Sequence, residues 1–73
     1  MLSLSMIETS KKLGENLRRI RVEKKITQAQ LASALSADKS FVSNIENGKT
    51  NPTLSTITNL AESLGVAVSE LLK

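Results

Sequence analysis

The chain has 73 residues, 40% hydrophobic and 23% charged, which is enough for one small domain and too little for a second core. The absence of cysteine and histidine excludes disulfides and the usual zinc staples, so association with another subunit is the remaining source of added stability. Ten Lys and Arg, seven of them within residues 11–25, against seven Asp and Glu give a net charge of +3, which favours a polyanionic partner.

The first predicted helix covers residues 11–24. Leu13, Leu17 and Ile20 recur at spacings of four and three with charges between them, which is the period of an amphipathic helix. Residues 1–10 are expected to form a loosely ordered amino-terminal extension. No apolar run approaches the ~20 residues of a membrane span, and we expect a cytoplasmic protein with no membrane partner.

The second and third predicted helices follow closely. Thr27 and Gln30 have the spacing of a capping box, so a helix begins at Thr27 and runs to about residue 36. Asp38 is the predicted N-cap of a helix over residues 39–47, which Gly48 ends. Two short helices separated by a break of a few residues indicate a helix-turn-helix unit, although two ordinary helices of a bundle are the alternative.

The remaining chain predicts two more helices and no strand. Pro52 lies in a loop over residues 48–53, and an apolar stripe then predicts a helix from about residue 54 to Leu64, ended by Gly65. A short final helix is expected over residues 69–72. The predicted class is therefore all α, with five helices in a single domain.

Four sequence segments carry a resemblance to a known family: Leu17-Arg18-Arg19-Ile20-Arg21, Thr27-Gln28-Ala29-Gln30-Leu31-Ala32, Phe41-Val42-Ser43-Asn44-Ile45-Glu46-Asn47-Gly48 and Pro52-Thr53-Leu54. Together they resemble the Cro and lambda-repressor helix-turn-helix family, also called the xenobiotic response element family. A chain this short also looks like the controller proteins of restriction-modification systems. The resemblance implies a five-helix DNA-binding domain whose third helix enters the major groove. Ser36 stands where the family usually has glycine. If the backbone there is left-handed, serine would cost about 1 kcal/mol of stability.

Base recognition is predicted for the polar face of the third helix. If Val42 and Ile45 face inward, the opposite face presents Lys39, Ser40, Ser43 and Asn44. Lysine can donate to guanine, asparagine can pair with adenine, and serine can serve several bases. A merely solvated helix face is the alternative. Phe41 lies about 100° around the helix axis from Val42; it is expected to fill the core near Pro52, and partial exposure beside a phosphate is the alternative.

Phosphate contacts are predicted at both ends of the helix-turn-helix unit. Thr27 and Gln28 stand at a helix amino terminus, where free amides favour anions, and the resemblance implies that Gln28 clasps the DNA backbone. Lys49, Thr50 and Asn51 look like a second clamp. The resemblance further implies a partly buried, structural ion pair between Arg21 and Glu46.

A homodimer is expected, because two copies related by a twofold axis can read a palindrome with half-sites about 34 Å apart. The carboxyl-terminal region holds more apolar residues than a small bundle obviously needs. We expect Val66, Val68 and Leu72 to lie in the dimer interface. The alternative is that these residues fill the core of the monomer.

The predicted function is that of a sequence-specific transcription regulator, such as a repressor or controller protein, that binds double-stranded DNA as a homodimer. With a single phenylalanine as its only aromatic residue, the chain does not suit the stacking of single-stranded bases. An antitoxin of the same fold, binding both DNA and a toxin, is the alternative. An enzyme is disfavoured by the lack of histidine, cysteine and a glycine-rich phosphate loop. In a chain of this size we expect no sensor domain, and neither a cofactor, a metal nor a small-molecule ligand is expected.

Overall fold

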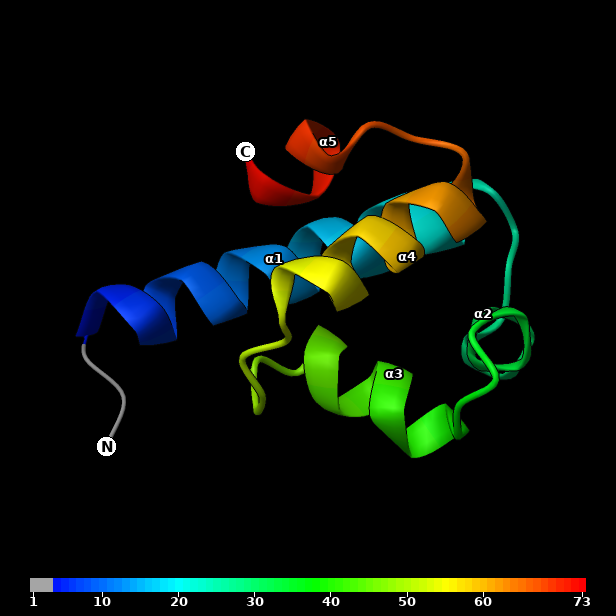
Figure 1. Ribbon diagram of the computed structural model, residues 1–73, viewed down its shortest axis with the longest axis horizontal. Coiled ribbons are helices and arrows are strands. Elements are labelled where there is room, and N and C mark those ends of the chain that lie inside the picture. The colour runs from blue at the N-terminus through cyan, green and yellow to red at the C-terminus, as the bar shows by residue number, and fades with distance from the viewer. Residues whose placement is uncertain (1–3) are drawn as a thin grey trace.

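The computed structural model describes residues 4–73, which form five helices and no strand. Figure 1 shows the shorter helices arranged around one long helix, with the third helix along one edge of the molecule. The helices are α1 (Leu4–Glu23), α2 (Gln28–Ala34), α3 (Lys39–Glu46), α4 (Leu54–Leu64) and α5 (Val68–Leu72). The predicted all-α, five-helix class is confirmed. No helix within residues 4–73 has the length and apolar character needed to cross a membrane.

The amino-terminal helix is longer than the sequence pattern indicated. It begins at Leu4, so the loose extension expected over residues 1–10 is wrong for residues 4–10, and residues 1–3 lie outside the described part of the chain. Ser10 is buried in phase with Leu13 and Leu17, but its hydroxyl has no hydrogen-bond partner among the described residues. A polar residue at a core position interrupted the apolar period and concealed this turn of the helix.

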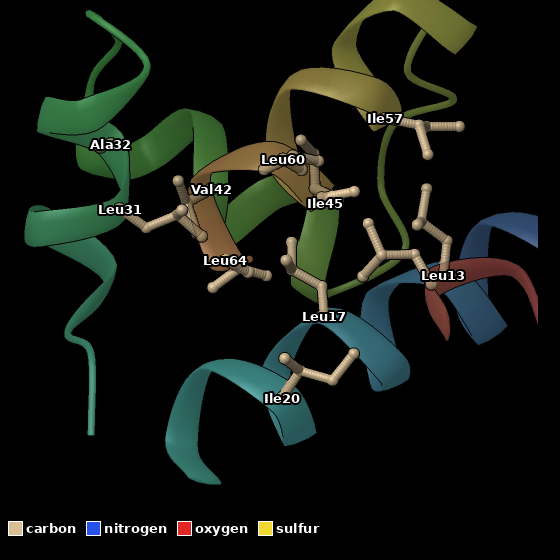
Figure 2. Packing of buried hydrophobic residues seen from close by; sticks show 12 residues of the cluster. Leu13, Leu17, Ile20, Leu31, Ala32, Val42, Ile45, Ile57, Leu60 and Leu64 are labelled. Atoms are coloured by element: carbon tan, nitrogen blue, oxygen red, sulfur yellow. The ribbon is translucent and has the colours of Figure 1, made fainter. Parts of the chain in front are cut away.

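One apolar core joins all five helices. Figure 2 shows leucine and isoleucine side chains of α1 pointing toward those of α3 and α4. Each large side chain removed from water in this way contributes about 1.5 to 3 kcal/mol. The buried apolar residues are Leu13, Leu17, Ile20, Leu31, Ala32, Val42, Ile45, Ile57, Leu60, Ala61, Leu64 and Leu71.

Each of the first four helices is followed by a residue with a left-handed backbone. The φ angles are 59° at Lys25, 55° at Ser36, 70° at Gly48 and 69° at Gly65. After each of these residues, the next amide donates to the carbonyl oxygen five residues earlier, a helix-ending motif in which glycine is favoured. Ser36 does adopt the left-handed conformation for which its cost was predicted, and Lys25 adopts it as well.

A close backbone approach connects α1 and α3. A Cβ atom added at Gly14 would lie 2.6 Å from the main-chain oxygen of Glu46, at the carboxyl-terminal end of α3. Such a contact is too short for any side chain, so glycine allows α3 to pack directly on the backbone of α1. The sequence reading did not single out this glycine.

Candidate nucleic-acid interface

The amino terminus of α2 is fixed by a capping box. The Thr27 Oγ1 atom accepts from the Gln30 amide at 3.0 Å, and the Gln30 Oε1 atom accepts from the Thr27 amide at 2.8 Å. This reciprocal arrangement was predicted and is confirmed. The box supplies acceptors for two of the backbone amides that have no intrahelical partner at a helix start.

The turn between α2 and α3 differs from the prediction in one respect. Asp38 is the N-cap residue of α3, but its side chain makes no capping hydrogen bond. Instead, the Phe41 amide donates to the main-chain oxygen of Asp38 at 3.0 Å. The exposed carboxylate therefore acts on the helix through its charge alone.

The outer face of α3 carries the residues predicted to read bases. Figure 1 shows α3 along one edge of the domain, on the far side from α5. Lys39, Ser40 and Asn44 are exposed, whereas Ser43 is half-buried and its hydroxyl accepts from the side-chain Nδ2 atom of Asn47 at 3.4 Å. The opposite face is buried in the core through Val42 and Ile45. Three of the four predicted residues are thus free to meet a ligand.

The prediction that Phe41 fills the core is wrong. It is 39% exposed. A residue directly before Val42 lies about 100° away around the helix, too far to share the inward face. Phe41 therefore adds an apolar ring beside the polar face of α3.

The Arg21 and Glu46 side chains form a two-point ion pair between α1 and α3. Arg21 Nε lies 2.6 Å from Glu46 Oε2, and Arg21 Nη2 lies 3.0 Å from Glu46 Oε1. The side chains are only 11% and 3% exposed. The hydrogen bond to Glu46 raises the pKa of Arg21 and outweighs desolvation, which lowers it. The Arg21 guanidinium therefore remains charged, and its two-point contact fixes α3 against α1.

Gln28 joins this pair in a way that the sequence did not reveal. Its Nε2 atom donates to Glu46 Oε1 at 3.1 Å. The Arg21 Nη1 atom also donates to the main-chain oxygen of Ile26 at 2.8 Å, which ties the α1–α2 turn to the same cluster. No motif relates residues 28 and 46, because their contact depends on how α2 and α3 cross.

A surface groove of about 680 Å³ opens beside the amino termini of α2 and α3. Its lining combines three cations with polar and apolar groups: Arg21, Val22, Lys25, Ile26, Thr27, Gln28, Ala29 and Lys39. Cations and amide donors suit an anionic group, and the apolar floor suits a less polar neighbour on the same ligand. A sugar–phosphate chain combines both kinds of group.

The loop after α3 lies at the other end of this helix. Lys49, Thr50 and Asn51 are all exposed there. The loop runs close to α1, because a Cβ atom added at Gly48 would be 3.2 Å from the Cα atom of Lys11. The residues predicted to contact phosphates thus lie in two places, at the start of α2 and in the loop after α3.

The three residues predicted for the dimer interface differ in how exposed they are. Val66 and Val68 are half-buried and pack against the core, whereas Leu72 is 45% exposed. Leu54 belongs to the apolar stripe predicted for the fourth helix, but at 68% it is the most exposed large hydrophobic residue within residues 8–73. Its position in the first turn of α4, after a proline loop, was the available signal.

Known helix-turn-helix proteins match this chain in sequence and in structure. A helix-turn-helix family model matches residues 17–71. The immunity repressor protein of Bacillus phage phi105 is 39% identical over 59 residues, which are 81% of this chain and 41% of the repressor. The crystal structure of the restriction-modification controller protein C.AhdI from Aeromonas hydrophila matches with a TM-score of 0.81 and 35% identity, over 85% of this chain and 94% of that one.

The same fold also occurs within a larger enzyme. The hydroxypropylphosphonic acid epoxidase from S. wedmorenis matches with a TM-score of 0.84 and 30% identity, over 89% of this chain but only 35% of the enzyme. The match covers about a third of that protein, so it carries the fold and not the chemistry. On the evidence of the matched residues and the geometry of α2 and α3, the chain belongs to the helix-turn-helix family.

Proposed function

We propose that the chain is a DNA-binding transcription regulator that inserts α3 into the major groove of duplex DNA. The observation that carries this proposal is the division of α3 into two faces. Val42 and Ile45 are buried, while Lys39, Ser40 and Asn44 project from an uncovered edge of the domain. A helix of this kind fits the major groove, which is about 12 Å wide.

Specificity comes from the exposed polar side chains of α3. Lys39 can donate to guanine O6 and N7, and the Asn44 amide can pair with adenine N6 and N7. The half-buried Ser43 contributes less than Ser40, because its hydroxyl already accepts from Asn47. The exposed ring of Phe41 adds an apolar surface of the kind that meets thymine methyl groups.

Phosphate contacts hold α3 in register from both ends. A sugar–phosphate strand fits the groove at the start of α2, with its phosphates near Lys25, Lys39 and Gln28. The opposite strand meets Lys49, Thr50 and Asn51, which are exposed at the other end of α3. These contacts supply affinity for any sequence and make binding weaker at high salt.

The active species is a homodimer on a palindromic operator. The exposed apolar side chains of Leu54 and Leu72 support it, since a protein of this size is stabilised by covering them. Two copies place two reading helices one turn of DNA apart, about 34 Å. Such a protein regulates transcription by its concentration, and the similarity to a phage immunity repressor and to a restriction-modification controller supports this role.

The test is a selection of bound duplexes from a random pool, followed by affinity measurements on the selected sequence. Lys39→Ala or Asn44→Ala is expected to weaken specific binding by about 1 to 3 kcal/mol and to relax preference at one position per half-site. Asn59→Ala, an exposed amide on α4, is the matched control and is expected to change neither. Unchanged affinity and preference in both α3 variants would show that α3 is not the reading helix.

A further inference from the structure

Three helices meet at one buried carboxylate. Glu46 Oε1 on α3 accepts from Arg21 Nη2 on α1 at 3.0 Å and from Gln28 Nε2 on α2 at 3.1 Å. The second carboxylate oxygen accepts from Arg21 Nε. The Gln28 side chain thus ends on a fixed anchor, although it also lines the groove in which a phosphate would lie.

The carboxylate determines which way the Gln28 amide faces. An amide group has a donor end and an acceptor end of nearly the same shape, and only the donor end can approach a carboxylate. One Nε2 hydrogen is therefore directed to Glu46, and the other remains available on the groove side. An ionised phosphate only accepts hydrogen bonds. The second Nε2 hydrogen of Gln28 is a donor that can meet a phosphate oxygen.

Holding the side chain in advance lowers the entropic cost of binding. A glutamine side chain loses rotamer freedom when it is fixed, and the anchor removes part of that loss from the binding step. The Arg21–Glu46 pair is neutral overall, so its influence on DNA is exerted through the orientation of Gln28 and not through net charge.

We propose that Glu46, itself held by Arg21, is a positioning residue for DNA binding that orients the Gln28 amide toward a backbone phosphate. The inference rests on the proposed function. It assigns to a buried ion pair a part in DNA affinity as well as in stability.

A double-mutant cycle on duplex DNA of random sequence tests the proposal, since a phosphate contact needs no operator. Gln28→Ala is expected to weaken binding about fivefold in the natural background, the size of one lost hydrogen bond. In the background Arg21→Met with Glu46→Leu, the same change is expected to weaken binding less than about twofold. This replacement preserves net charge and leaves no buried charge without a partner.

The control background replaces the exposed pair of Arg19 and Glu23, whose charged atoms lie 3.6 Å apart, by the same residues, Met and Leu. There, Gln28→Ala is expected to keep its full effect. Urea unfolding of every variant ensures that affinities refer to folded protein. An equal effect of Gln28→Ala in all backgrounds, or no effect in any, would overturn the proposal.

Nuclear magnetic resonance of the protein without DNA provides an independent readout. The Gln28 side-chain amide is expected to be more rigid than the exposed amide of Asn59, and to become equally mobile when the buried pair is replaced. A Gln28 amide as mobile as that of Asn59 in the natural protein would also overturn the proposal. Failure to bind any duplex would instead contradict the proposed function, so the two failures are distinguishable.

Discussion

The helices α3 and α5 both pack against α1, but different forces hold them there. Gly14 brings α3 against the backbone of α1, and the Arg21–Glu46 pair adds two directional bonds. The short helix α5 is held by the fully buried Leu71, whose main-chain oxygen accepts one hydrogen bond from Asn16 Nδ2 at 2.9 Å. Directional bonds specify orientation, whereas apolar burial is non-directional. Of these two helices, the one proposed to read DNA is therefore the more tightly oriented.

The largest effect is expected from breaking the attachment of α3. Glu46→Ala leaves the Arg21 guanidinium buried without its partner and is expected to lower the free energy of unfolding by about 3 to 5 kcal/mol, as measured by urea denaturation. Glu23→Ala removes a carboxylate from the exposed pair with Arg19 and is expected to cost less than about 1 kcal/mol. Similar losses in the two variants would mean that burial does not distinguish the two pairs.

Truncating Leu71 tests whether apolar burial holds α5 against α1. Leu71→Ala removes a fully buried side chain and is expected to destabilise the domain by about 2 to 5 kcal/mol. Leu72→Ala, one residue further on and largely exposed, is expected to cost less than about 1 kcal/mol of monomer stability. Thermal or urea unfolding measures both. If the Leu72 variant is the less stable of the two, α5 does not dock through Leu71.

Sedimentation then separates the role of Leu72 in association from its role in folding. In the proposed homodimer, Leu72→Ala is expected to shift the monomer–dimer equilibrium toward monomer by about tenfold, because a leucine side chain loses part of its buried apolar area. Ser69→Ala, an exposed neighbour on α5, is the control and is expected to leave the equilibrium unchanged. A natural protein that is monomeric at tens of micromolar would remove the interface altogether.

The smallest effect is expected at the turn between the two helices of the helix-turn-helix unit. Ser36→Gly relieves a left-handed backbone and is expected to raise the free energy of unfolding by about 0.5 to 1 kcal/mol. Ser33→Gly, inside α2 with a helical backbone, is expected to lower it by a similar amount. The opposite signs are the critical result. A loss of stability in both variants would show that Ser36 is not strained.

Much of the fold could be predicted because its signals are local. The capping box at Thr27, the glycine stop at Gly65 and the period of Leu13, Leu17 and Ile20 each depend on residues a few positions apart. The fifth helix was predicted despite its five residues, because Ser69 and Glu70 precede the apolar pair Leu71 and Leu72.

The features that escaped the sequence reading depend on contacts between helices. Ser10 is buried only because other helices cover it, and Gln28 meets Glu46 only because α2 and α3 cross at a particular angle. Asp38 is the N-cap residue of α3, as its residue type predicted, but its side chain makes no capping hydrogen bond. For Phe41, hydrophobic character suggested the core, but its place around the helix axis decided its exposure.

The contact at Gly14 has a consequence for how far the third helix stands out from the body of the protein. Since main-chain atoms meet main-chain atoms there, no rotamer change can absorb a new methyl group. Alanine at this position would push the end of α3 outward and tilt its polar face away from its present direction. In the proposed complex with DNA, one methyl group remote from the reading side chains would thereby change the preferred binding sequence.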